Sequence, residues 1–216
     1  AFWQRGKLEY PRPETPQILL AAFRADPQHA PLTTPSGKIE LFSSTVAGFG
    51  YAECPGHPFW LAPEADDARW PLHLLSSQPR TRLHSQYDHG TLSQQTKIAG
   101  REPLWLHPQD ATQRGLSEGD IVNVFNARGS LLAGVHLSDG IRPGVVQMST
   151  GAWYDPINTR DAQPLDKHGN PNVLTDDRGS SRLGQGCTAQ SCRVEIVRFD
   201  APLPPITAWD PPEFVP

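Results

Sequence analysis

The 216-residue sequence contains few cysteines, and their arrangement argues against two common kinds of site. Cys54, Cys187 and Cys192 are odd in number, and their spacing matches neither a zinc motif nor the four spaced cysteines of an iron–sulfur cluster. We therefore expect neither a metal site built on cysteine nor a disulfide framework. The three residues are expected to be buried free thiols.

Long apolar runs and an excess of basic residues are also missing. No stretch approaches the ~18 apolar residues that a membrane span needs, and the N-terminus lacks the apolar core of a signal peptide. Lysine and arginine number 19 against 23 acidic residues, which gives a net charge of −4. A chain without a basic field is not expected to bind nucleic acid. Because it begins at Ala1 and holds one methionine, Met148, we expect a processed chain or a piece of something larger.

Proline and glycine are abundant, with 23 and 18 residues, which favours a turn-rich β protein. Residues 1–68 are punctuated by proline and are expected to form an extended, partly helical arm that links to a preceding domain. Within it, Thr15 and Pro16 can start a helix that ends before Pro27. The alternating residues 38–42 predict an edge strand.

Residues 69–200 predict a compact β domain, and residues 201–216 a proline-rich tail. Short β-branched or alternating segments are separated by turn residues, with one short helix among them. This pattern favours a small barrel, and the lack of β-α-β alternation argues against a Rossmann fold. The expected strands are residues 70–75, 104–106, 121–126, 131–137 and 145–148, and the expected helix is residues 107–115.

The loop that follows the first of these strands is the strongest candidate binding site. A strand that opens into hydroxyls, a carboxamide, guanidiniums and an imidazole places many hydrogen-bond donors at one strand end. Such a set suits a large, oxygen-rich, anionic ligand. The candidate residues here are Ser76, Ser77, Gln78, Pro79, Arg82, Leu83, His84, Ser85 and Gln86.

A second candidate is the segment 168–175, which contains Asn170 and Asn172. The run Gly-Asn-Pro-Asn is by itself a strong turn signal, so taken alone it predicts a plain turn. Each asparagine, however, presents an amide with both a donor and an acceptor edge. Paired with the first loop, the segment is interpreted as a second binding loop.

Five segments carry a resemblance to a known family. Residues 107–129 contain the spaced pattern His-Pro, Ala, Gly-Leu-x-Glu-Gly-Asp and Asn-x-Arg-Gly. This pattern resembles the C-terminal dinucleotide-binding domain of molybdopterin oxidoreductases, whose fold is a six-stranded double-psi β-barrel. Residues 34–41, 82–86 and 168–175 resemble the lead-in and two cofactor loops of the dimethyl sulfoxide reductase branch. Residues 185–194, which begin with Gln185, resemble biotin sulfoxide reductase most, with trimethylamine N-oxide reductase next.

The resemblance implies a specific cofactor, bis(molybdopterin guanine dinucleotide) molybdenum. Arg82 would then contact a pyrophosphate, and the serines would donate to phosphate or ribose oxygens. Gln78, Asn170 and Asn172 would recognise pterin or guanine, and Gln185 joins the cofactor-binding set. Asp176 is a chemically plausible acceptor for guanine, and in this branch the aromatic segment 151–156 can lie near the cofactor.

The implied protein is a reductase that removes oxygen from an S-oxide or N-oxide, such as biotin sulfoxide, trimethylamine N-oxide or dimethyl sulfoxide. In the family, the serine ligand of molybdenum lies in an earlier domain, and no serine here matches its motif. We therefore expect this fragment to be inactive alone, with the parent enzyme's other domains and a small oxide as partners and the electron donor open. The expected location is the cytoplasm, with the periplasm as the alternative.

A rival interpretation is a non-catalytic double-psi barrel that serves as an adaptor or a peptide-binding module. Such barrels share the helix–turn–strand unit but have no reason to carry both candidate loops. The two interpretations differ in geometry, because only a cofactor site requires the loops to converge on one concave edge of the barrel.

Overall fold

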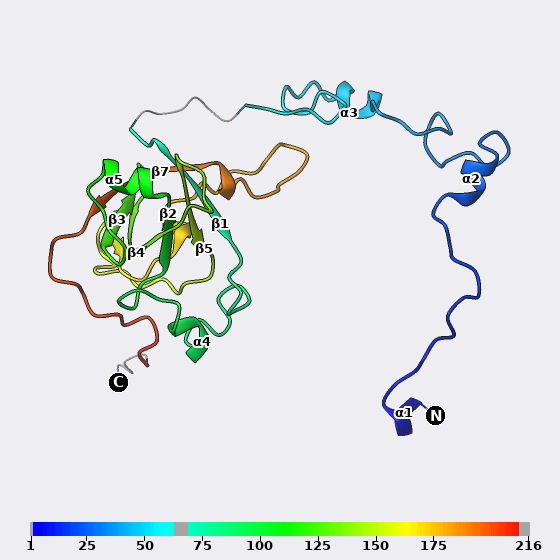
Figure 1. Cartoon of the computed structure of the whole chain (residues 1–216). Helices are drawn as coiled ribbons and strands as arrows, with labels where there is room; N and C mark the ends of the chain where they lie inside the picture. The colour runs from blue at the N-terminus through cyan, green and yellow to red at the C-terminus, as the bar shows by residue number, and fades with distance from the viewer. Residues whose placement is uncertain (1, 63–68, 212–216) are drawn as a thin grey trace. The chain divides into compact units, whose positions relative to one another are not determined.

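The computed structural model of the chain describes residues 2–62 and 69–211 (Figure 1). The chain divides into two units, Ala1–Phe59 and Trp60–Pro216. The expected boundary at residue 68 lies outside the described residues. In the part that is described, no helix has the length and apolar character needed to cross a membrane.

The first unit contains short helices and little buried surface. The helices are α1 (Phe2–Arg5), α2 (Ala21–Ala25) and α3 (Ser44–Gly48). Among residues 2–59 only Gly56 is buried. The described residues of this unit are partly helical, as expected. That the unit is an arm linking to a preceding domain stays a prediction.

Two local predictions for this unit are wrong. The helix predicted from Thr15 begins only at Ala21, because Leu20 takes a left-handed conformation with φ 59°. The edge strand predicted at residues 38–42 does not form. A strand needs a neighbour to satisfy its backbone groups, and no described part of residues 2–59 joins the sheet.

The second unit is a closed β-barrel with few helices, as predicted. Six strands are hydrogen-bonded in the ring order β2-β5-β1-β7-β3-β4, and β2 pairs with β4 to close it. β6 pairs with Ser130 and Leu131 at the start of β4. The strands are β1 (Leu72–Ser77), β2 (Pro103–Leu106), β3 (Ile121–Phe125), β4 (Ser130–Leu137), β5 (Val145–Ser149), β6 (Leu165–Asp166) and β7 (Cys192–Arg198). The helices are α4 (Thr91–Gln94), α5 (Pro108–Gln113), η1 (Pro171–Val173) and η2 (Ala189–Ser191).

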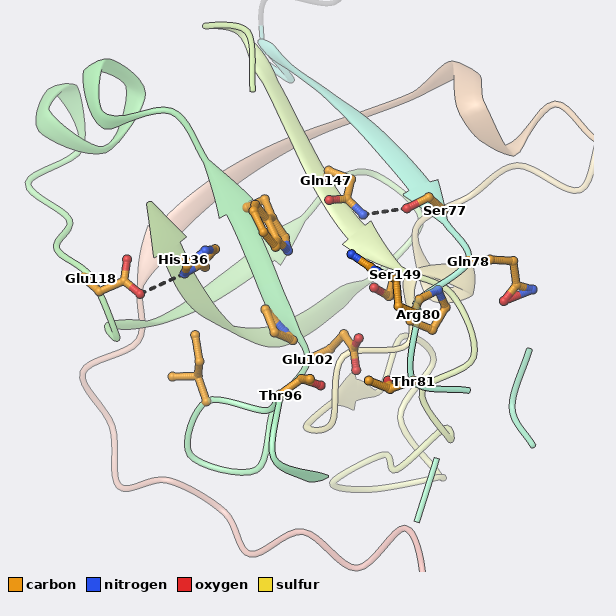
Figure 2. A pocket seen from close by; sticks show the side chains of 14 residues that line it. Ser77, Gln78, Arg80, Thr81, Thr96, Glu102, Glu118, His136, Gln147 and Ser149 are labelled. Carbon is orange, nitrogen blue, oxygen red and sulfur yellow. Dashed lines mark hydrogen bonds and ion pairs between the residues drawn. The ribbon is translucent and has the colours of Figure 1, made fainter. Parts of the chain in front are cut away.

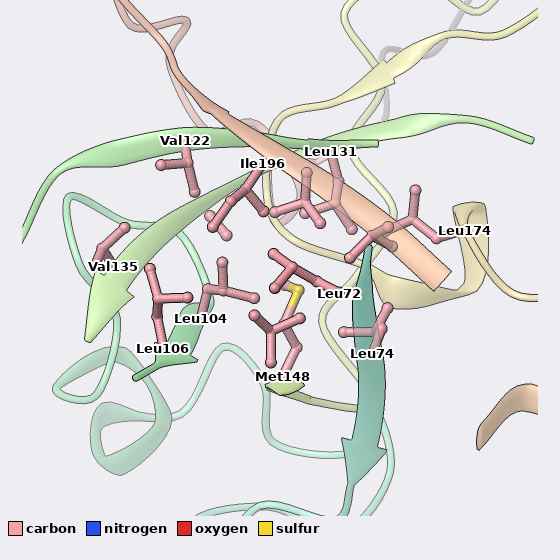
Figure 3. Packing of buried hydrophobic residues seen from close by; sticks show 14 of the residues in the cluster. Leu72, Leu74, Leu104, Leu106, Val122, Leu131, Val135, Met148, Leu174 and Ile196 are labelled. Atoms are coloured by element: carbon pink, nitrogen blue, oxygen red, sulfur yellow. The ribbon is translucent and has the colours of Figure 1, made fainter. Parts of the chain in front are cut away.

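The barrel interior is filled by aliphatic side chains from every strand of the ring (Figure 3). Leu74, Leu104, Val122 and Met148 have no exposed surface, and each comes from a different strand. Packing of this kind stabilises the barrel through the apolar area removed from water. The barrel interior is therefore occupied by its hydrophobic core.

The register of one strand pair decides where the candidate loops emerge. β1 and β5 are parallel, with Ser77 opposite Ser149 at their carboxyl ends. The segments that follow these two strands therefore leave the barrel at the same edge. β1 also extends two residues further than predicted, so Ser76 and Ser77 lie on the strand, and their side chains point to opposite faces.

All three cysteines are free, as expected, but only one is buried. Cys192, on β7, donates its thiol to the carbonyl of Leu174 at 3.3 Å. Burial raises the pKa of Cys192 to about 11, so its thiol is not reactive near neutral pH. Cys187 is exposed and Cys54 is partly exposed, which corrects the expectation that all three are buried.

Candidate functional site

Three segments from different strands surround one open cavity of about 750 Å³. The first segment follows β1, the second is residues 150–154 after β5, and the third contains residues 170 and 172 after β6. Six of the predicted residues line it, namely Ser76, Gln78, His84, Ser85, Asn170 and Asn172. The two loops that sequence reasoning paired are therefore brought together at one concave edge of the barrel.

Within the first segment, Gln78 and His84 hold each other. The amide Nε2 of Gln78 donates to Nδ1 of His84 at 2.7 Å, and the backbone N–H of His84 donates to Oε1 of Gln78 at 3.1 Å. With Nδ1 accepting, the neutral imidazole carries its proton on Nε2. His84 adopts a left-handed φ of 51° in this arrangement. The pair gives the cavity wall a fixed imidazole donor.

The second segment packs directly against the first. Gly151 has φ 90°, and a Cβ added there would lie 1.7 Å from the carbonyl oxygen of His84, so only glycine fits. The indole Nε1 of Trp153 donates to the carbonyl of Ser85 at 2.8 Å. Two loops that are far apart in sequence thus form one continuous wall.

The third segment is fixed by a buried carboxylate. Oδ2 of Asp166 accepts from the backbone N–H groups of Gly169 and Asn170, both at 2.7 Å, and Asp166 has no exposed surface. Oδ1 of Asn170 in turn accepts from the N–H of Asn172 at 3.0 Å. The Nδ2 donors of Asn170 are not used in this turn, so they are available to a ligand at the cavity.

Arg82 does not take the predicted role. Its side chain is fully buried, and its two terminal nitrogens lie 3.1 Å from Glu102 and 3.5 Å from Asp88. They also donate to the hydroxyl of Ser93 at 3.0 Å and to the carbonyl of Thr150 at 2.8 Å. The expected contact with a pyrophosphate is corrected accordingly, because the guanidinium faces protein carboxylates and not the cavity. Arg82 instead joins the first segment to the second.

Lys97 completes this buried cluster. Its Nζ lies 2.9 Å from both Asp88 and Glu102, so two cations face two anions. Burial raises the pKa of Asp88, but the hydrogen bond and charge of Lys97 outweigh it and hold that pKa below its usual value. The backbone N–H of Trp153 also donates to Asp88 at 3.1 Å. The cluster therefore fixes the position of the second segment of the cavity wall.

His168 lies beside this cluster, close to Asp88, and its imidazole is neutral. Its Nδ1 donates to the carbonyl of Trp153 at 2.7 Å, while its Nε2 lies 3.8 Å from Asp88. Burial and the charge of Lys97 lower the pKa of His168, despite the opposing carboxylates of Asp88 and Asp166. An uncharged imidazole thus links the base of the third segment to the second.

The remaining predicted residues lie elsewhere. Ser77 and Pro79 line a second cavity of about 560 Å³, to which Gln78 also belongs (Figure 2). In that cavity the hydroxyl of Ser77 accepts from Gln147 at 2.6 Å, and Trp105 packs edge-to-face on His136.

Leu83, Gln86 and Gln185 line neither cavity. Leu83 and Gln86 are exposed and pair with each other across a tight turn. Gln185 is exposed and donates to the carbonyl of Ser181 at 2.7 Å. Asp176, the plausible guanine acceptor, lies 3.2 Å from Arg128, which makes an ion pair with it.

Sequence reasoning missed several residues that build the site. Thr150 lines the cavity, and the parallel pairing of β1 with β5 is the signal that could have found it. The loops are held by buried charged residues, namely Asp88, Lys97 and Asp166, but none of these belongs to a recognisable motif. Segment 151–154 was expected near a cofactor, and the structure places it in the cavity wall.

The cavity's chemistry fits the implied ligand. Its described lining offers hydroxyls, amides, an imidazole, an indole and a phenol, and holds no carboxylate that would repel an anion. Its volume is within the range of pockets for cofactors and other small molecules. In the described residues there is no group of three or more His, Cys, Asp or Glu side chains able to hold a metal ion. The residues present therefore suit the organic part of such a cofactor.

Comparison with known proteins identifies the class. The family described as "Molydopterin dinucleotide binding domain" matches residues 72–193, and the chain belongs to this family. It is 46% identical over 220 residues to "Trimethylamine-N-oxide reductase" of Salmonella typhi, covering 98% of this chain and 26% of that protein. It is 39% identical over 217 residues to "Dimethyl sulfoxide/trimethylamine N-oxide reductase" of Cereibacter sphaeroides, with coverage of 98% and 26%.

The structural neighbours agree with the fold. "Acetylene Hydratase from Pelobacter acetylenicus" superimposes with a TM-score of 0.62 at 19% identity, covering 81% of this chain and 25% of that one. The chain thus spans about a quarter of the length of the curated relatives it matches. A match to a cofactor-binding family and the convergence of the two loops leave the adaptor interpretation without support.

Proposed function

We propose that this chain is the cofactor-binding part of a molybdenum-dependent reductase that acts on an N-oxide or S-oxide. The cofactor would be bis(molybdopterin guanine dinucleotide) molybdenum. The observation that carries the proposal is the convergence of Gln78, His84, Asn170 and Asn172 on one cavity. The family match and the names of the relatives support it.

The residues of this chain bind and orient. When bound, the cofactor supplies the chemistry of removing oxygen from the substrate. Ser76 and Ser85 offer hydroxyls to phosphate or ribose oxygens, and His84 offers an N–H donor. The amides of Asn170 and Asn172 suit the mixed donor and acceptor edges of a pterin or guanine. Since no serine here matches the metal-ligand motif, the rest of the parent protein would complete the site.

The test is cofactor content in the full-length protein that contains this chain. We expect Asn170→Ala/Asn172→Ala to lower bound molybdenum and guanine nucleotide severalfold, because each lost hydrogen bond weakens binding by about 1 kcal/mol. Asn158→Ala is the matched control, since Asn158 lies in an exposed loop and contacts Asp161. Absence of molybdenum and guanine from the wild-type protein would overturn the proposal, as would full content in the double variant.

The relatives favour an N-oxide substrate. Both kinds of relative carry trimethylamine N-oxide in their names, and one also carries dimethyl sulfoxide. Steady-state kinetics of the full-length protein with trimethylamine N-oxide, dimethyl sulfoxide and biotin sulfoxide would rank the three. We expect the highest kcat/KM for trimethylamine N-oxide. The cytoplasmic location is likewise proposed, and cell fractionation tests it against the periplasm.

A further inference from the structure

The segment 204–209 follows β7 and was expected to be a proline-rich tail. It forms no regular strand or helix, yet it is tied to the barrel unit at several points. The carbonyl of Pro204 accepts from the guanidinium of Arg101, and Ile206 packs close to Gly100. Two further residues of the segment, Thr207 and Trp209, make contacts that lead to the cavity.

Thr207 binds a buried carboxylate with both of its donors. Its hydroxyl donates to Oδ1 of Asp155 and its backbone N–H to Oδ2, each at 2.7 Å, while Lys167 donates to its hydroxyl at 2.8 Å. The backbone N–H of Asp155 donates to Asp166 at 2.8 Å. Asp166 is the carboxylate that fixes Asn170. One chain of hydrogen bonds therefore runs from Thr207 to the third segment of the cavity.

Trp209 reaches the second segment by a separate route. Its indole packs edge-to-face on His168, with ring centroids 4.7 Å apart. Lys97 lies 5.7 Å from the indole centroid, within cation–π range. His168 donates to the carbonyl of Trp153, and Trp153 lines the cavity. Trp209 thus covers the buried imidazole whose partner is a cavity residue.

We propose that segment 204–209 is a positioning strap for the cofactor pocket, with Thr207 and Trp209 as its positioning residues. Thr207 fixes the Asn170 turn through Asp155 and Asp166, and Trp209 fixes Trp153 through His168. A tail bound only by apolar packing would not deliver two donors to one buried carboxylate. The strap's hydrogen bonds and its ring contact go to residues behind the lining, namely Arg101, Asp155, Lys167 and His168, so it acts on how long a cofactor stays bound. This inference rests on the proposed function.

Cofactor release from the purified full-length protein tests the strap. Molybdenum and guanine nucleotide that remain with the protein are measured over time for Thr207→Val, Thr207→Ser, Trp209→Ala and Trp209→Phe. Valine keeps the shape of threonine but removes the hydroxyl and with it the hydrogen bonds to Asp155 and Lys167. We expect release to become at least about threefold to tenfold faster, the range that follows from losing one hydrogen bond. Serine retains the hydroxyl and should restore slow release. Trp209→Ala should also speed release, and Trp209→Phe should restore most of the slow release that Trp209→Ala loses.

A second measurement keeps the result independent of the cofactor. Amide hydrogen exchange at Gly169 and Asn170 should accelerate in Thr207→Val and not in Thr207→Ser. Leu203→Ala is the control, because Leu203 is an exposed side chain just before the strap. If wild-type protein carries no molybdenum or guanine, the proposed function fails. If it carries both, and Thr207→Val releases cofactor and exchanges amides at the wild-type rate, the strap inference fails.

Discussion

The two units of this chain contain similar apolar residues and bury them very differently. In the barrel unit, Leu74 and Leu104 have no exposed surface, whereas in residues 2–59 Leu19 is 84% and Leu41 82% exposed. The difference lies in pairing. Each barrel strand has hydrogen-bonded neighbours that turn one face inward, and the described residues of the first unit join no sheet. Local sequence signals therefore produce a packed region only where a partner strand exists.

The largest effect expected is from the buried cluster of the barrel unit. Arg82→Ala removes one of two cations that face Asp88 and Glu102, and it should lower the free energy of unfolding by about 3–5 kcal/mol. The matched change in the first unit, Arg24→Ala, removes an exposed side chain and should change stability by less than about 0.5 kcal/mol. Urea unfolding of both variants measures the contrast.

Arg82→Ala should also lower molybdenum and guanine content in the full-length protein, because Arg82 connects the loop after β1 to Thr150. A loss of cofactor without a loss of stability would instead support the original prediction that Arg82 contacts the ligand directly. Equal stability of Arg82→Ala and Arg24→Ala would remove the contrast between the two units.

Glycines provide the next comparison. Gly151→Ala places a Cβ against the backbone of His84 at a positive φ, and we expect a loss of about 1–3 kcal/mol together with a displaced cavity wall. Gly48→Ala, in α3, meets nothing within 4 Å and should leave stability nearly unchanged. Thermal unfolding of the two variants checks this. An unchanged Tm for Gly151→Ala would show that His84 and Gly151 can separate at little cost.

The sequence predicted the parts of the molecule whose causes are local. The helix 107–115 is bracketed by Pro108 and Gly115, and α5 forms between them because proline is favoured at the first helical position and glycine just after the helix end. Residues 121–126 are rich in β-branched side chains, and β3 follows them closely. In the first unit, residues 38–42 alternate like a strand, but no described residue of that unit pairs with them in a sheet.

The location of the site was predictable to the extent that polar side chains cluster where predicted strands end. The two loops carried clusters of polar side chains, and six of those residues line the cavity. Arg82 was misassigned because its partners, Asp88 and Glu102, follow it in the chain without any motif. Which of several arginines becomes buried depends on how the loop folds back. That information exists only in the tertiary structure.

The smallest effect expected is a pH dependence of stability that comes from His168 in the barrel unit. The pKa of His168 is lowered by burial and by Lys97, against the pull of Asp88 and Asp166. In the unfolded chain its pKa returns to about 6.5. Below that pH the unfolded state binds a proton that the folded state does not. The free energy of unfolding should therefore fall as the pH decreases from about 6.5, by at most about 1.4 kcal/mol per pH unit for this one group.

His168→Asn isolates this contribution, because asparagine retains an N–H donor for the carbonyl of Trp153 and does not titrate. The pKa of Asp88 is also lowered, but its contribution is lost only near and below its ordinary value of 3.8, so it does not enter the window between pH 5 and 6.5. The free energy of unfolding, measured with urea across this window, should fall more steeply with decreasing pH for the wild type than for His168→Asn. Equal slopes for the wild type and His168→Asn would mean that His168 titrates alike in the folded and unfolded chain, which would contradict this expectation.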